Sequence, residues 1–154
     1  MSEASIVGPQ GGEVVLPGPI EVRMVEDGSG TAHRLAVAVL TVPPRTDGTP
    51  PHWHQKHDEM SYVTAGRFSV GDTEREAPAG TFVSLPIGAE HSFANPGDEP
   101  AIILNTFTPD IYVGYFRDLG NLAAMGEMTP EAILAVMARY ATYPAGTPAP
   151  DSTH

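Results

Sequence analysis

Apolar and polar residues alternate in short segments over the first 107 residues of the chain. Because successive side chains of a strand point to opposite faces of a sheet, this alternation predicts half-buried strands. Eight segments show the pattern: residues 13–16, 20–25, 33–42, 60–64, 67–70, 81–85, 91–94 and 101–107. Turn-forming glycine, proline, asparagine and aspartate separate nearly all of these segments. So many short strands favour an all-β fold, either a sandwich or a barrel.

Helical periodicity begins only after the last predicted strand. Asp110 is a candidate N-cap for a helix that ends near Gly120, with apolar residues recurring on one face. Thr129 is a candidate N-cap for a second helix, with Pro130 at the first helical position. An apolar stripe continues over residues 133–140. We therefore expect two C-terminal helices that pack on the strands.

The length of the chain, 154 residues, is that of one folded domain. From residue 144 onward the composition is dominated by proline, alanine, glycine, threonine and serine, with no apolar stripe to bury. We expect a single domain over residues 1–143 and a disordered C-terminal tail over residues 144–154.

Charge and cysteine content exclude several classes of function. Nineteen acidic residues against eight basic ones give a net charge of −11, which repels nucleic acids and anionic membranes. The absence of cysteine excludes disulfides, thiolate nucleophiles and cysteine-ligated metal sites. The first residues do not resemble a signal peptide, and the apolar runs are too short to span a bilayer. We expect a soluble, cytoplasmic protein with neither nucleic acid nor membrane as a partner.

Three histidines and a glutamate are the candidate metal ligands. His52 and His54 are two residues apart, so in a strand their imidazoles project from the same face. Glu59 follows beyond a polar turn, where a hairpin would bring its carboxylate back over the pair, and His91 follows a second tight turn. Three imidazole nitrogens and one carboxylate oxygen suit one divalent ion of iron, nickel, manganese, copper or zinc, with one or two positions left for water, dioxygen or substrate.

The segments that hold these residues resemble the two sequence motifs of the cupins, a superfamily of small β-barrels. The first motif is Gly, then His-x-His, four residues, Glu, six residues, Gly. All of it after the opening glycine is matched, by His52, His54, Glu59 and Gly66. Its opening glycine departs from the usual spacing, because Gly48 lies four residues before His52 instead of six. The second motif, Gly-x5-Pro-x-Gly-x2-His-x3-Asn, is matched by Gly80, Pro86, Gly88, His91 and Asn95.

This resemblance implies a cupin double-stranded β-helix, or jelly-roll barrel, followed by the two helices. It also implies that His52, His54, Glu59 and His91 are metal ligands that point into the barrel. The alternative is a metal-free cupin in which the four residues form a polar pocket. Such a pocket would leave buried polar groups unpaired, at about 1–3 kcal/mol each.

The other candidate residues surround this set. His57 has no counterpart in the motifs, and we expect it to be a solvated loop residue, with a proton shuttle or a contact behind the ligands as the alternative. A substrate pocket is predicted to use four aromatic residues: Phe93, Tyr112, Tyr115 and Phe116.

The sequence Phe-Thr-Pro at residues 107–109, followed by an aromatic helix, is similar to the layout of the quercetin dioxygenase-like cupins. This similarity implies a metal-dependent dioxygenase that acts on a small enolic or phenolic, flavonol-like substrate, with dioxygen as co-substrate and Glu59 as the general base. The alternatives are a metal-dependent isomerase or cyclase, and a non-catalytic cupin that binds a small molecule. Because cupins commonly pair through barrel edges, we also expect a homodimer.

Overall fold

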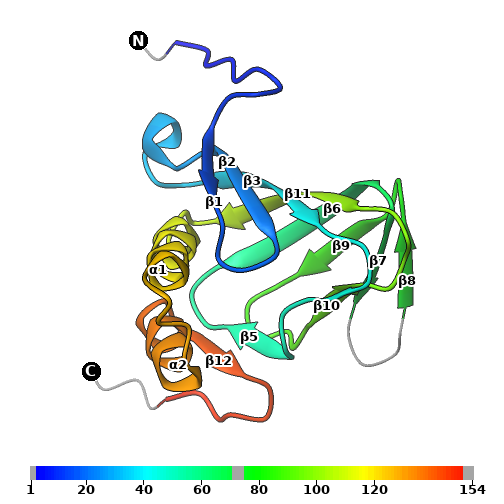
Figure 1. Ribbon diagram of the computed structural model, residues 1–154. Helices are drawn as coiled ribbons and strands as arrows, with labels where there is room; N and C mark the ends of the chain where they lie inside the picture. Colours follow the sequence, from blue (N-terminus) through cyan, green and yellow to red (C-terminus); the bar gives the residue numbers. More distant parts are fainter. Residues whose placement is uncertain (1–2, 71–74, 151–154) are drawn as a thin grey trace.

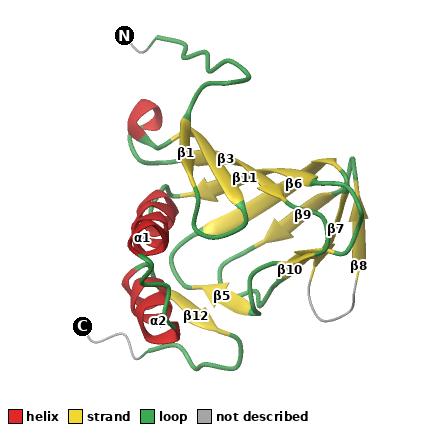
Figure 2. Cartoon of the chain, viewed as in Figure 1, coloured by secondary structure: helices red, strands yellow, loops and turns green. Residues whose placement is uncertain are grey.

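The computed structural model describes residues 3–70 and 75–150 of the chain (Figures 1 and 2). The elements in chain order are β1 (Glu13–Val15), β2 (Glu21–Glu26), the 3-10 helix η1 (Ser29–Thr31), β3 (Ala36–Val42), β4 (Thr46–Asp47), β5 (His52–His54), β6 (Asp58–Ala65), β7 (Arg67–Val70), β8 (Arg75–Pro78), β9 (Phe82–Leu85), β10 (Phe93–Asn95), β11 (Ala101–Thr108), α1 (Tyr112–Met125), α2 (Pro130–Arg139) and β12 (Thr142–Pro144). The structure is mostly β with two C-terminal helices, as expected, and closure of the strands into a jelly-roll barrel stays a prediction.

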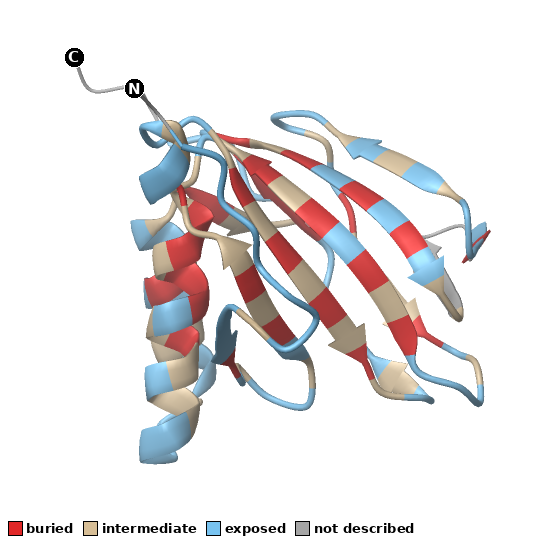
Figure 3. Ribbon diagram, turned by 90° about the horizontal axis from the view of Figure 1, so that it is seen from above, coloured by how far each residue is buried: buried red, intermediate tan, exposed pale blue. Residues whose placement is uncertain are grey.

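The described strands form three antiparallel sheets. The largest has the order β1-β2-β3-β11-β6-β9, the second has the order β4-β10-β7-β8, and β12 pairs with β5. Burial alternates along β3, β6 and β11, as the banding in Figure 3 shows, so each of these strands turns one face toward the core. The inward face of β6 carries Glu59, Ser61 and Val63. This alternation is what aims the Glu59 carboxylate into the interior.

The two α-helices lie together at one side of the strands (Figure 1). Helix α1 buries the aromatic face that the sequence predicts, but it continues beyond Gly120 to Met125 and ends at Gly126, whose φ of 71° is the left-handed conformation that glycine adopts readily. Asp110 does not cap α1, because its carboxylate lies 2.7 Å from His33 Nδ1. Thr129 does cap α2, since its hydroxyl accepts a hydrogen bond from the Ala132 N–H. Within the described residues, no helix has both the length and the apolar character needed to cross a membrane.

Two short strands that the alternation did not predict, β5 and β12, lie side by side. Thr142 pairs with His54 and Pro144 with His52, and the Ala145 N–H then donates to the Pro51 carbonyl oxygen. The chain after α2 therefore returns to the strand that carries two of the candidate ligands. The domain boundary after residue 143 stays a prediction, and residues 151–154 of the expected tail lie outside the described residues.

Candidate metal centre

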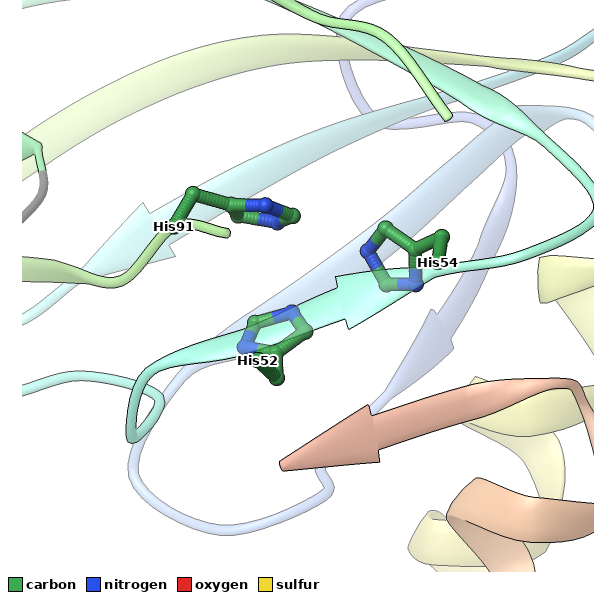
Figure 4. Close-up of side chains that lie close together, drawn as sticks. All are labelled: His52, His54 and His91. Atoms are coloured by element: carbon green, nitrogen blue, oxygen red, sulfur yellow. The ribbon is translucent and has the colours of Figure 1, made fainter. Parts of the chain in front are cut away.

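His52, His54 and His91 bring their imidazoles together, as Figure 4 shows. His52 and His54 come from β5, and His91 is joined to that strand by backbone hydrogen bonds to and from His52, of 2.8 and 2.9 Å. All three side chains are buried. One nitrogen from each ring lies within 4.8 Å of the others, which is the separation expected of atoms that share an ion.

Hydrogen bonds on the outer side of the cluster fix which ring nitrogen faces inward. His52 Nδ1 lies 2.8 Å from the Pro50 carbonyl oxygen, and His91 Nδ1 lies 2.9 Å from that of Ala89. A carbonyl oxygen only accepts, so both Nδ1 atoms carry a proton, and in the neutral imidazole each Nε2 keeps its lone pair. The inward Nε2 atoms are therefore ready to bind a metal in the neutral imidazole form.

His54 is held in the same tautomer by a residue from the end of the chain. Its Nδ1 lies 2.9 Å from Thr142 Oγ1, while the Thr142 hydroxyl itself donates to the Tyr140 carbonyl oxygen at 3.4 Å. The hydroxyl proton is thus already used, and the Thr142 oxygen accepts the Nδ1 proton of His54. Sequence patterns could not identify Thr142 as a partner of His54, because it lies 88 residues away on a strand three residues long.

Glu59 faces this cluster from β6. Its Oε1 lies 3.3 Å from His54 Nε2, and its Oε2 lies 3.6 Å from His91 Nε2. Burial raises the pKa of the Glu59 carboxyl, but the imidazoles of the neighbouring histidines outweigh it and hold the pKa well below its usual range. Glu59 is therefore ionised at neutral pH and presents two oxygen atoms that accept hydrogen bonds but cannot donate them.

Burial governs the charge of the histidines on β5. It lowers the pKa of His52 to about 4, with the nearby His91 acting in the same direction, and it lowers the pKa of His54 as well. Burial also opposes the charge of His91, but the Glu59 carboxylate beside it raises the pKa of that imidazole. His52 and His54 are accordingly neutral at pH 7, the state in which imidazole binds metals.

The expectation that His57 is a solvated loop residue is wrong. The residue does lie in the short link between β5 and β6, but its side chain is 0% exposed and packs between His54 and Tyr112, with ring centroids 4.2 and 4.5 Å away. The loop is covered because α1 packs over it. Sequence spacing alone could not show this, since the covering helix begins 55 residues later.

The buried polar atoms of this cluster fit a bound metal ion. Nε2 of His54 and Nε2 of His91 are buried and have no hydrogen-bond partner among the described residues. An unpaired buried acceptor costs about 1–3 kcal/mol, whereas a divalent ion would satisfy both lone pairs and the facing carboxylate. The donor set of imidazole nitrogens and carboxylate oxygen is that of a first-row transition metal.

A cavity of about 550 Å³ lies beside the cluster, and His52 is part of its wall. Its lining is mostly apolar and comes from the segment around β2, from α1 and from α2. Of the four predicted pocket residues, Phe93, Tyr115 and Phe116 line it. Tyr112 is not part of the lining. Its ring stacks on Tyr115 and also contacts the rings of His54 and His57. A cavity of this size suits an organic molecule of a few rings.

We expect Thr142→Val to weaken metal binding without unfolding the chain. Valine keeps the shape of threonine but cannot accept the Nδ1 proton of His54, so the tautomer and orientation of that imidazole are no longer fixed. Loss of such an outer partner typically lowers metal affinity by roughly 10- to 100-fold. Competition with a chromophoric chelator measures the affinity, with Thr147→Val, outside the cluster, as the matched control. Equal affinities for the wild type and Thr142→Val would contradict this role.

Acid should destabilise the metal-free protein through His52. Its pKa is lowered on folding, so between about pH 6.5 and 4 the unfolded chain binds more protons at this residue than the folded chain. The contribution of neutral His52 is present above pH 6.5 and is lost as the pH falls, by up to about 3 kcal/mol. Urea unfolding of chelator-treated wild type and His52→Gln across this range should show a steeper loss in the wild type. Parallel pH profiles would refute the assignment.

Comparisons with known proteins bear on the fold that carries this cluster. The cupin domain family model matches residues 38–107, the segment that contains all four predicted ligands. No curated protein sequence matches the chain significantly.

Three solved structures illustrate the shared fold. KdgF from Halomonas sp. is 20% identical, with a TM-score of 0.61, and the match covers 70% of this chain and 94% of that one. The polyketide cyclase RemF from Streptomyces resistomycificus is 21% identical, with a TM-score of 0.60 and coverages of 70% and 80%. A sugar phosphate isomerase of the cupin superfamily from Silicibacter pomeroyi is 24% identical, with a TM-score of 0.52; the match covers 58% of this chain and only 59% of that protein. At these identities the likeness shows the cupin fold, and it leaves the activity open.

Proposed function

We propose that this cupin-fold chain is a metal-dependent enzyme of the dioxygenase type, with one divalent transition-metal ion held by His52, His54, Glu59 and His91. Its proposed substrates are dioxygen and a small enolic or phenolic molecule of flavonol-like character. The observation that carries the proposal is the position of the apolar cavity, whose wall includes one of the proposed metal ligands, His52. A substrate in this cavity would lie beside the ion.

The lining of the cavity favours this substrate class over phosphorylated sugars. Within the described residues, it includes no lysine or arginine, and its only carboxylate is Asp47. A phosphate group would meet no cation there, whereas aromatic rings would pack against Phe93, Tyr115 and Phe116. The chemistry of the neighbouring sugar phosphate isomerase is therefore a poor match for this cavity.

The residues of the site have separable roles in this proposal. The bound ion would supply Lewis acidity, which lowers the pKa of a substrate hydroxyl. Glu59 would accept the hydroxyl proton at a carboxylate oxygen, because it is ionised and buried beside the imidazoles. The aromatic wall would orient the ring and exclude water. Thr142, Pro50 and Ala89 would hold the imidazoles in their ligating orientation.

Oxygen uptake tests this proposal. The chain is stripped with chelator, reloaded separately with iron, nickel, manganese, copper or zinc, and given a flavonol or a panel of enols in an oxygen-electrode cell. We expect dioxygen consumption in step with loss of substrate for at least one metal. Product formed equally well without dioxygen would instead support a metal-dependent isomerase or cyclase. Tight binding with no product under either condition would support a non-catalytic binding protein.

We also propose that the chain forms a homodimer through the outer face of the largest sheet. Leu104, Tyr62 and Phe82 are register partners across β11, β6 and β9, and they are 36%, 45% and 60% exposed. A row of exposed apolar side chains is the kind of surface that a second copy covers. Sedimentation should give a dimer that Tyr62→Glu converts to a monomer. A wild-type monomer would refute the proposed homodimer.

The cytoplasmic location stays a prediction.

A further inference from the structure

His57 is enclosed by aromatic rings behind the three-histidine cluster. Besides His54 and Tyr112, the ring of Phe107 approaches it edge-on, with centroids 6.1 Å apart. Neither ring nitrogen of His57 makes a hydrogen bond to these three residues. Apart from the Glu59 carboxylate, this wall is uncharged and solvent-free, a setting in which an imidazole without a polar partner is costly.

Both ring nitrogens of His57 are buried without a hydrogen-bond partner among the described residues. A neutral imidazole has one donor and one acceptor, and leaving each unpaired costs about 1–3 kcal/mol. The Glu59 carboxylate lies 3.5 Å from Nε2, which is longer than an ordinary hydrogen bond. A metal ion would use the acceptor lone pair, because neutral imidazole is a common metal ligand.

His57 belongs to a second set of ligand atoms. Its Nε2 lies 3.5 Å from Glu59 Oε1, and the same oxygen lies 3.3 Å from His54 Nε2. The ligand atoms of His54, His57 and Glu59 all lie within 4.8 Å of one another, as do those of His52, His54 and His91. The two sets share His54, and Glu59, a ligand of the proposed metal centre, also faces His91 of the first set, at 3.6 Å from its Nε2.

We propose that His54, His57 and Glu59 form a second position for the metal ion, adjacent to the three-histidine position. This inference rests on the metal centre of the proposed function. The two positions exclude each other, because Thr142 occupies Nδ1 of His54 and leaves that ring a single lone pair, on Nε2. The chain therefore holds one ion, divided between two positions.

The two positions differ in their access to the cavity. His52, from the three-histidine set, lines the cavity, whereas His57 does not; Glu59 lies between the two sets, 3.3 Å from His54 Nε2 and 3.6 Å from His91 Nε2. An ion held by His57 would therefore be farther from a substrate in the cavity than an ion held by His52. Transfer between the positions therefore sets what fraction of the bound metal can meet substrate, and a ligand that binds the ion from the cavity would draw it toward His52.

Nitrogen NMR of the full chain tests this assignment with Zn²⁺, which is diamagnetic. The chain is labelled with ¹⁵N-histidine, its ring resonances are assigned, and Zn²⁺ is added to saturation. We expect ring nitrogens of His52, His54, His57 and His91 to shift, while those of His33, which is largely exposed and paired with Asp110, stay in place. No activity measurement enters this readout.

Two substitutions test the exchange between the positions. In His57→Phe, which fills the same aromatic space without a ligand atom, the shifts of His52 and His91 should grow because every ion then occupies their position. In His91→Phe, the shift of His57 should grow instead. His33→Phe is the matched control and should change neither.

Each result separates this inference from the proposed function. If His52, His54 and His91 respond to Zn²⁺ but the His57 ring does not, the second position is refuted and the metal centre stands. If none of the four responds, both proposals fail. The wild-type titration decides these outcomes even where a variant does not fold.

Discussion

Replacing Glu59 by glutamine is expected to lower turnover by roughly 10²- to 10⁴-fold, the loss typical of removing a general base. Glutamine keeps the size of the side chain and one oxygen atom that can face the imidazoles, but it cannot accept a proton at neutral pH. Glu59 is buried and lies 3.3 Å from His54 Nε2. Because glutamine has the same size, the substitution should disturb the packing there little. Metal affinity should therefore fall much less than turnover.

The measurement is turnover per bound metal ion, so that lost occupancy is not mistaken for lost chemistry. Glu59→Ala should lose both metal affinity and turnover. Glu127→Gln, the same change at an exposed position after α1, is the matched control and should leave both unchanged. If metal-loaded Glu59→Gln turns over at the wild-type rate, another group accepts the proton and the role assigned to Glu59 is wrong.

His54→Ala is expected to have the largest effect on metal binding. His54 belongs to both groups of ligand atoms, so its loss leaves neither group complete. The affinity should fall by more than the roughly 10- to 100-fold that follows loss of an outer partner such as Thr142. Chelator competition and elemental analysis after dialysis give the affinity and the retained metal.

His33→Ala is the control for this substitution, because His33 is a histidine outside the cluster whose partner is Asp110. The two variants should differ sharply in retained metal although both lose one imidazole. A His54→Ala chain that binds metal as tightly as the wild type would show that the ion lies elsewhere.

The sequence predicted the long strands of the fold well because each buries only one face. β3, β6 and β11 alternate between buried and less buried positions, which is the pattern that periodicity detects. β5 could not be found this way, since all three of its residues are buried. β12 was missed because its pairing with β5 depends on how α2 returns the chain, which local composition does not encode.

The same distinction applies to the site. The spacing of His52 and His54 placed two imidazoles on one strand face, and the structure brings His91 and Glu59 to them. The roles of His57 and Thr142 could not be predicted in this way. His57 is buried by α1, and Thr142 is placed beside His54 by β12. Both depend on contacts between segments far apart in the chain.

Elemental analysis of the wild-type chain tests the central claim most directly. Chelator-treated protein is dialysed separately against iron, nickel, manganese, copper and zinc salts, then against buffer, and its metal content is measured beside that of a variant in which His52, His54 and His91 are all alanine. We predict one retained ion per wild-type chain for at least one metal and none in the triple variant. Equal metal content in the two proteins, or none in the wild type with any metal, would contradict the account.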